Sequence, residues 1–106
     1  MGNEYYRICY TPLSFEDLDV LGGYIAKTLC NPSAAEKLLD KMEKSINQLS
    51  RFPYIGAPVS DAYIAAKGYR RIAVDNYLVF YLVHEDKKEV VIMRILYGAR
   101  EYHNLL

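Results

Sequence analysis

The side chains best suited to bind an anionic target are four arginines in about the last forty positions: Arg70, Arg71, Arg94 and Arg100. A guanidinium group binds a carboxylate or a phosphate through parallel hydrogen bonds, so an exposed arginine suits recognition of either group. Arg70 and Arg71 stand at the start of an apolar segment, where either could contact a target or be a solvated charge at a sheet edge. The four arginines are therefore the candidate target-binding residues.

Arg94 differs from the others because it lies within the apolar run Val90 to Tyr97. Burying an unpaired charge is costly, so this position favours a structural ion pair over a free cation. The candidate partners are three carboxylates: Asp75, Glu16 and Asp17.

Metal chemistry finds no support in the sequence. Cys9 and Cys30 do not form a Cys-x-x-Cys motif, and His84 and His103 do not complete a zinc-binding spacing with them. We expect no metal and no cofactor, and we expect both cysteines to behave as small buried hydrophobic residues.

Composition indicates one globular domain over residues 1–106. The chain is 52% apolar and 25% charged, which is ordinary for a folded protein, and it has no run long enough to span a membrane. Without a secretory signal pattern, a cytoplasmic location is expected. The 13 basic and 13 acidic residues cancel, whereas a protein that grips a phosphate backbone usually has a basic surplus.

Two helices are predicted in the first half of the chain. The segment Tyr5 to Thr11 is aromatic and β-branched and predicts a strand, after which Ser14 is expected to cap a helix. A second helix is expected to begin with Ser33 as its cap. Each helix has an apolar stripe, one of Leu18, Leu21, Tyr24 or Ile25, and Leu29, the other of Ala35, Leu38, Leu39, Met42, Ile46 and Leu49. The pair should form a helical hairpin.

The second half is predicted to be a strand region. A proline-rich loop at 52–58 and a short helical turn at 61–66 precede strands at 69–74, 77–84 and 90–97, with Asp75-Asn76 as a two-residue turn. A short helix is expected at 99–106. The element order is therefore β-α-α-β-β-β, an α+β fold in which the helical hairpin packs on a twisted, mainly antiparallel sheet.

These features resemble the RelE/ParE superfamily of toxins from type II toxin–antitoxin modules. The resemblance spans nearly the whole chain and is most specific in its last forty residues. It rests on the passage Leu49-Ser50-Arg51-Phe52-Pro53-x-x-Gly56, on the hairpin from Gly68 to Tyr81, and on the closing segment from Val91 to Glu101.

The resemblance implies one of two activities, because RelE-like members cut messenger RNA on the ribosome and ParE-like members poison DNA gyrase. A nuclease of this kind would here use Arg71, Arg100 and Tyr102 or His103 as catalytic residues. One recurring nuclease arginine directly follows the tyrosine that begins the second hairpin strand, and Leu78 occupies that position. Tyr97 stands where several relatives carry histidine, and a tyrosine is a poor base at neutral pH.

The missing arginine and the zero net charge favour a ParE-like toxin that arrests growth by inhibiting DNA gyrase. A RelE-like, ribosome-dependent mRNA endoribonuclease is the alternative, and a degenerate chain that only binds its partner is a third. The resemblance also implies a cognate antitoxin, through which any contact with DNA would be indirect. Its apolar anchors are expected to meet a set of helical residues: Leu18, Tyr24, Leu39 and Met42.

Overall fold

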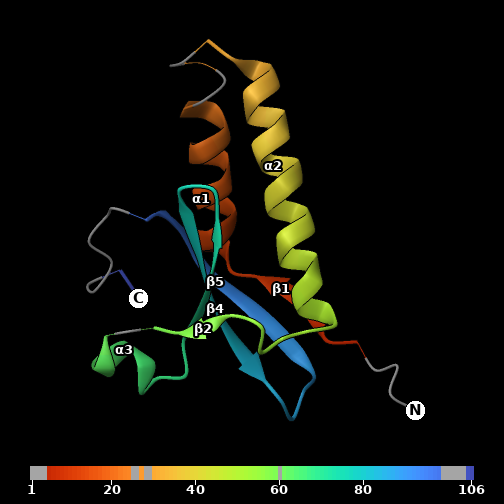
Figure 1. Cartoon of the computed structure of the whole chain (residues 1–106), viewed down its shortest axis with the longest axis vertical. Helices are drawn as coiled ribbons and strands as arrows, with labels where there is room; N and C mark the ends of the chain where they lie inside the picture. Colours follow the sequence, from red (N-terminus) through yellow and green to blue (C-terminus); the bar gives the residue numbers. More distant parts are fainter. Residues whose placement is uncertain (1–4, 25–26, 28–29, 60, 99–104) are drawn as a thin grey trace.

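The computed structural model describes residues 5–24, 27, 30–59, 61–98 and 105–106 (Figure 1). Its elements, in chain order, are β1 (Arg7–Tyr10), α1 (Pro12–Gly23), α2 (Pro32–Asn47), η2 (Gln48–Ser50), β2 (Ala57–Pro58), α3 (Ala62–Ala65), β3 (Arg70–Val74), β4 (Tyr77–His84) and β5 (Glu89–Tyr97). The expected β-α-α-β-β-β order is confirmed, with the two-residue strand β2 added inside the predicted loop. The predicted C-terminal helix falls largely outside the described residues.

Both long helices begin before the serines that the sequence suggested as caps. The Thr11 hydroxyl accepts a hydrogen bond from the Ser14 amide at 3.1 Å, and the Asn31 side chain accepts one from the Ala34 amide at 3.1 Å. A proline follows each cap, where its missing N–H costs nothing and its fixed φ suits the first helical turn. Predicting Ser14 and Ser33 as caps was therefore wrong.

The sheet has the strand order β1-β5-β4-β3-β2. β1 runs parallel to β5, and all other neighbouring strands are antiparallel. The strands β4 and β5 have neighbours on both sides in the sheet, and their sequences are apolar on both faces. Asp75 adopts φ 53° in the two-residue turn that joins β3 and β4, which is the left-handed conformation that such a hairpin turn requires.

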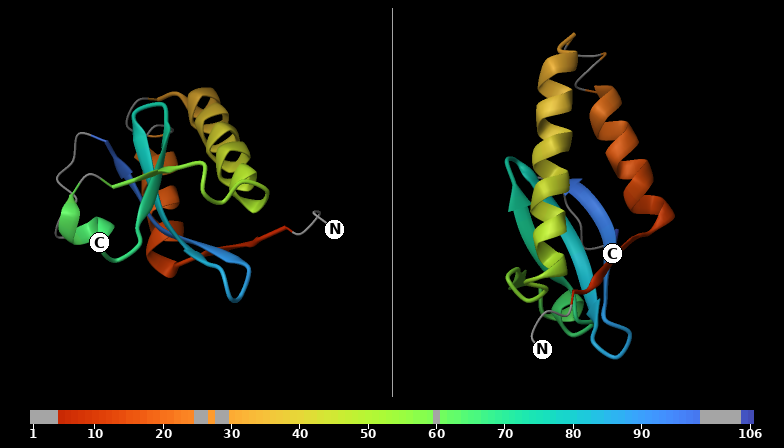
Figure 2. Two further views of the ribbon diagram at one scale, coloured as in Figure 1. Left: turned by 60° about the horizontal axis from the view of Figure 1, so that its bottom comes forward. Right: turned by 90° about the vertical axis from the view of Figure 1, so that its right-hand side faces the viewer.

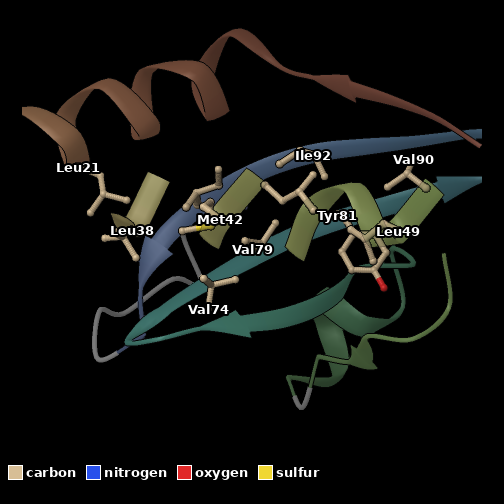
Figure 3. Packing of buried hydrophobic residues seen from close by; sticks show 11 residues of the cluster. Leu21, Leu38, Met42, Leu49, Val74, Val79, Tyr81, Val90 and Ile92 are labelled. Atoms are coloured by element: carbon tan, nitrogen blue, oxygen red, sulfur yellow. The ribbon is translucent and has the colours of Figure 1, made fainter. Parts of the chain in front are cut away.

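The helical hairpin covers one face of the sheet, as two views agree (Figures 1 and 2). Figure 3 shows the core beneath it, where Met42 of α2 lies above Val79 of β4. Gly22 of α1 has a packing role, because a Cβ at this position would lie 3.2 Å from Leu39 Cδ1. The buried members of this core are Leu21, Leu38, Met42, Ile46, Leu49, Val74, Val79, Tyr81, Val90, Ile92 and Ile95.

Within the part of the chain that the structure describes, the opposite face of the sheet is only partly covered. A smaller cluster packs there under α3, and Leu105 and Leu106 contact it. Its buried members are Val59, Ile64, Tyr69, Phe80 and Leu96. Among the described residues, helices therefore cover one face of the sheet, whereas α3, Leu105 and Leu106 cover only part of the other face.

Two further expectations are resolved by the fold. Cys30 is exposed and Cys9 is half-buried, so the expectation that both would be buried was wrong. Among the described residues, no helix is long and apolar enough to cross a membrane.

Candidate functional site

Arg94 is held by Asp17 in a two-pronged ion pair across α1 and β5. Its Nε and Nη2 donate to the two Asp17 carboxylate oxygens at 2.8 and 2.9 Å, and the Ile95 amide donates to the same carboxylate at 2.9 Å. Both side chains are at most 15% exposed. The hydrogen bonds to Asp17 raise the pKa of Arg94 above its usual value.

Arg94 is therefore a structural residue, which corrects its prediction as a target-binding cation. Its Nη1 also donates to the Leu105 carbonyl oxygen at 3.2 Å, which leaves little of the guanidinium free. The structural alternative considered for this position was right, and Asp17 is the partner among the three carboxylates considered.

Arg70 also has a structural task, since it holds the loop that leads into β2. Its Nε donates to the Gly56 carbonyl oxygen at 2.9 Å, and its Nη2 donates to the Tyr54 carbonyl oxygen at 3.1 Å. The guanidinium carbon also lies 5.3 Å from the centre of the Tyr54 ring, within the range of a cation–π contact. Both hydrogen bonds of the Arg70 guanidinium therefore go to the protein's own backbone.

Arg71 is the contrasting case, because it makes no hydrogen bond or ion pair with any residue that the structure describes. It is half-buried and lies one position along β3 from Arg70. It lines a hollow of about 330 Å³ at the open end of the sheet, which we call the turn hollow. The turn hollow is formed by Arg71, Asp75, Asn76, Tyr77, Leu78, Tyr97 and Gly98.

Leu78 stands in the turn hollow where a nuclease of the resembling superfamily would present an arginine. It is half-buried and packs against the smaller apolar cluster of the open face. Tyr97 is 51% exposed, and its ring meets that of Tyr77 edge-on at 5.7 Å. Within the described residues, the turn hollow thus has one arginine, one carboxylate and an apolar wall. Arg100, Tyr102 and His103 lie outside the described residues.

An apolar hollow of about 590 Å³ lies between α1 and the end of β5. We call it the α1 hollow. It is lined by Asp17, Val20, Leu21, Tyr24, Tyr77, Ile95, Leu96 and Tyr97. Val20 is 69% exposed and Tyr24 is 53% exposed, so the wall formed by α1 faces solvent. This placement keeps Tyr24 available for a protein partner.

The other predicted antitoxin contacts divide between surface and core. Leu18 and Leu39 are half-buried and line a second apolar groove between α1 and α2, together with Phe15. Met42 is only 1% exposed and packs in the main core. Met42 also lines the floor of this groove, so a partner seated between α1 and α2 would lie above it, and its role as an antitoxin contact stays a prediction.

Sequence reasoning missed a polar cluster centred on Glu85, in the turn between β4 and β5. Its carboxylate accepts hydrogen bonds from the hydroxyls of Tyr6 at 2.7 Å and Tyr54 at 2.6 Å, and from Lys88 at 3.1 Å. These bonds lower the pKa of Glu85 to about 2, and the bond to Glu85 raises the pKa of Tyr54 to about 12. The four residues come from three distant segments, so no local spacing could have revealed them.

A family model described as the ParE toxin of the type II toxin–antitoxin system parDE matches residues 8–102. The chain belongs to the ParE toxin family. The match covers most of the chain, from the first residues of β1 through β5 and beyond it. The expected membership of the RelE/ParE superfamily, nearer to ParE, is confirmed. No curated protein sequence matches the chain.

Solved structures show the same fold at low sequence identity. The chromosomal ParDE system from P. aeruginosa contains a chain that is 19% identical, with a TM-score of 0.72 and coverage of 90% of this chain and 98% of that one. The RelBE2 toxin–antitoxin complex from Mycobacterium tuberculosis gives 21% identity, a TM-score of 0.60, and coverage of 88% and 98%. The E. coli RelBE complex contains a chain that is 15% identical, with a TM-score of 0.58 and coverage of 90% of this chain and 99% of that one. The ParE-family fold is thus shared with RelE-type toxins.

Proposed function

We propose that this ParE-family chain is a toxin that arrests growth by inhibiting DNA gyrase and is neutralised by a cognate antitoxin. The observation that carries the proposal is the ParE toxin family match over residues 8–102. Two features of the chain support the gyrase target over RNA cleavage. Leu78 provides no cation in the turn hollow, and the chain has no basic surplus.

Arg71 is the residue that this proposal places against the target. Arg70 and Arg94 bind the protein's own groups, so only Arg71 among the three keeps its donors for another molecule. The Arg71 guanidinium and the exposed Tyr97 ring lie beside each other. Together they suit a protein surface that offers a carboxylate to the guanidinium and an apolar side chain to the ring. The turn hollow is therefore proposed as the gyrase-facing surface.

Supercoiling by purified gyrase tests the proposal. The purified chain should inhibit supercoiling of relaxed plasmid, and its expression should arrest growth and induce a DNA-damage response. Arg71→Ala should weaken inhibition by about tenfold, as expected for the loss of one charge-assisted hydrogen bond. Arg51→Ala is the matched control, because Arg51 is exposed and lies outside the turn hollow. Normal supercoiling at saturating wild-type protein refutes the gyrase target.

Ribosome-dependent cleavage of messenger RNA is the second candidate, and the free Arg71 guanidinium on the open face is the observation that favours it. A positioned cation can stabilise the charge that develops on a phosphate during cleavage. Translating ribosomes programmed with a defined message should then give cuts that Arg71→Ala abolishes. Intact message at growth-arresting concentrations excludes this activity.

The antitoxin is proposed to cover the α1 hollow. Its exposed apolar wall needs an apolar partner, and the acidic Glu16 and Asp19 on the same helix favour a partner segment with flanking basic residues. Tyr24→Asp should weaken binding of the antitoxin by about 100-fold, because it places a charge in an apolar contact. The measurement is calorimetric titration, with the exposed Lys27→Asp as control. Unchanged affinity of Tyr24→Asp would place the antitoxin elsewhere.

A further inference from the structure

Three tyrosines line the α1 hollow from three different elements, and we call Tyr24, Tyr77 and Tyr97 the tyrosine cluster. Tyr24 directly follows α1, Tyr77 begins β4, and Tyr97 ends β5. Tyr77 and Tyr97 lie opposite each other in the sheet, and their ring centres are 5.7 Å apart with the ring planes at 69°. These two rings form a corner, and Tyr24 adds a third ring from the helix.

The hydroxyl groups of the tyrosine cluster lie near one another and have no partner of their own among the described residues. Burial raises the pKa of Tyr77 above its usual value, and the nearby phenol groups of Tyr97 and Tyr24 raise it further. No described residue forms a hydrogen bond with any of the three hydroxyls. Each hydroxyl can donate one hydrogen bond and accept others. The cluster therefore places unused hydrogen-bonding groups inside a largely apolar hollow.

The charges around the α1 hollow favour a cation as its ligand. Asp17 is the one charged residue among the described residues that line it, and Asp17 already neutralises Arg94. Glu16 and Asp19 are exposed on the same helix. The face of an aromatic ring carries partial negative charge, so the tyrosine rings attract a cation and repel a carboxylate.

The hydroxyls and the rings together select arginine among the side chains of a protein partner. An apolar side chain seated on the cluster would remove water from three hydroxyls and give them no hydrogen bond in return, which is costly. A lysine ammonium is strongly hydrated and cannot stack on a ring. A guanidinium group is planar, stacks on aromatic faces, and has five N–H donors for hydroxyl oxygens.

We infer that the tyrosine cluster binds one arginine side chain of the antitoxin between its rings. The inference rests on the proposed position of the antitoxin over the α1 hollow, and it names the side chain that this hollow recognises. A hollow of about 590 Å³ is large enough for a drug-sized molecule. It therefore has room for the arginine beside the tyrosines and for apolar side chains beside Val20, Leu21 and Ile95.

Titration of the full chain with two small probes tests the recognition directly. The probes are N-acetyl-arginine amide and N-acetyl-citrulline amide, because citrulline has nearly the shape of arginine and no charge. Nuclear magnetic resonance of the tyrosine rings should show saturable shifts with the arginine probe, with a Kd at least about tenfold lower than that of the citrulline probe. Equal binding of the two probes, or no shift with the arginine probe, overturns the inference.

A double-mutant cycle identifies the arginine in the complex with the antitoxin that is encoded beside this chain. Each arginine of the antitoxin is changed to glutamine in turn, and binding is measured to the wild-type chain and to Tyr97→Leu. One of these changes should raise the Kd by at least about tenfold with the wild-type chain and by less than about twofold with Tyr97→Leu. Equal losses with both chains for every antitoxin arginine contradict the inference.

Three controls accompany the cycle. Tyr97→Phe keeps the ring and should lose less affinity than Tyr97→Leu. Tyr63→Leu changes an exposed tyrosine of α3, outside the α1 hollow, and should leave the coupling intact. Matching thermal unfolding establishes that all the variants fold. Loss of the coupling in Tyr63→Leu as well would show that the effect does not come from the tyrosine cluster.

Other outcomes separate this inference from the proposals on which it builds. Tyr24→Asp still weakens the complex, because a short, solvated carboxylate offsets little of what the lost ring contributes. If Tyr24→Asp weakens binding but no arginine couples to Tyr97, the antitoxin covers the hollow through apolar contacts, and only the arginine inference fails. A dimer of the free chain that Tyr97→Leu dissociates would assign the cluster to a second copy and overturn the inference. Absence of gyrase inhibition together with a coupled arginine would refute only the gyrase target.

Discussion

Strands β3 and β5 each carry an arginine, and the two arginines differ in their surroundings. Arg94 lies between α1 and β5, where Asp17 binds two of its nitrogens and solvent is nearly excluded. Arg71 lies on β3, beside the turn hollow and without a partner among the described residues. The sequence presents both as arginines in apolar strands. The comparison teaches that the neighbouring element, and not the residue type, decides whether a cation holds the fold or is left for a partner.

The largest effect is expected from breaking the Asp17–Arg94 pair. Asp17→Ala removes the acceptor of Arg94 Nε and Nη2 and of the Ile95 amide, so the free energy of unfolding should fall by about 3–5 kcal/mol. Urea denaturation measures it. Asp19→Ala is the control, because Asp19 is exposed on the same helix and should change stability by less than about 0.5 kcal/mol. A similar small loss for Asp17→Ala would remove the distinction between the two arginines.

A smaller effect is expected from the loop that leads into β2. Gly56→Ala would place a Cβ 2.4 Å from the Tyr81 hydroxyl and 2.6 Å from the Arg71 carbonyl oxygen, so the loop must move, at a cost of about 1–3 kcal/mol. Gly23→Ala is the matched control, since no atom lies within 4 Å of its added Cβ and alanine favours helix by about 1 kcal/mol. Thermal unfolding should move the two variants in opposite directions. Equal shifts would show that the loop is not held tightly against β3.

The smallest effect concerns the Glu85 cluster and depends on pH. The pKa of Glu85 lies near 2 in the folded chain and near 4.5 in an unfolded one, so the contribution of this carboxylate is complete above pH 4.5 and declines as pH falls towards 2. Glu85→Gln should flatten the dependence of stability on pH in this window. Asp86→Asn, in the same turn, is the control. An unchanged pH profile for Glu85→Gln would show that the tyrosine hydrogen bonds add nothing measurable.

Much of the fold was predictable because its signals are local. The α2 stripe of Ala35, Leu38, Met42 and Ile46 is buried as its spacing predicts, and the Asp75-Asn76 turn joins β3 and β4 as expected. The ends of the helices were not predictable from the cap motif alone. Serine at 14 and 33 matches the motif, but the proline after Thr11 and Asn31 starts each helix earlier.

The candidate site was predictable only in part, because its geometry depends on contacts between distant segments. Asp17 was one of three possible partners for Arg94, and only the packing of α1 on β5 selects it. Nothing in the local spacing indicates that Tyr6 and Tyr54 bind Glu85, since each tyrosine lies 31 or more positions from Glu85 in the sequence. The lack of a side-chain partner for Arg71 among the described residues likewise depends on which distant segments lie beside β3, and local spacing does not show this.

The parallel pairing of β1 with β5 has a consequence for folding during synthesis of the protein. Arg7 of β1 lies opposite Glu89 of β5, which is 82 positions away. β1 therefore cannot pair with its neighbour until β5 has been translated. Contacts of such long sequence separation form slowly and late. A nascent chain that stops before β5 lacks the strand that joins β1 to the sheet and carries one wall of the α1 hollow, so we expect it to be harmless to its host. The sheet is thus complete only after β5 has been synthesised.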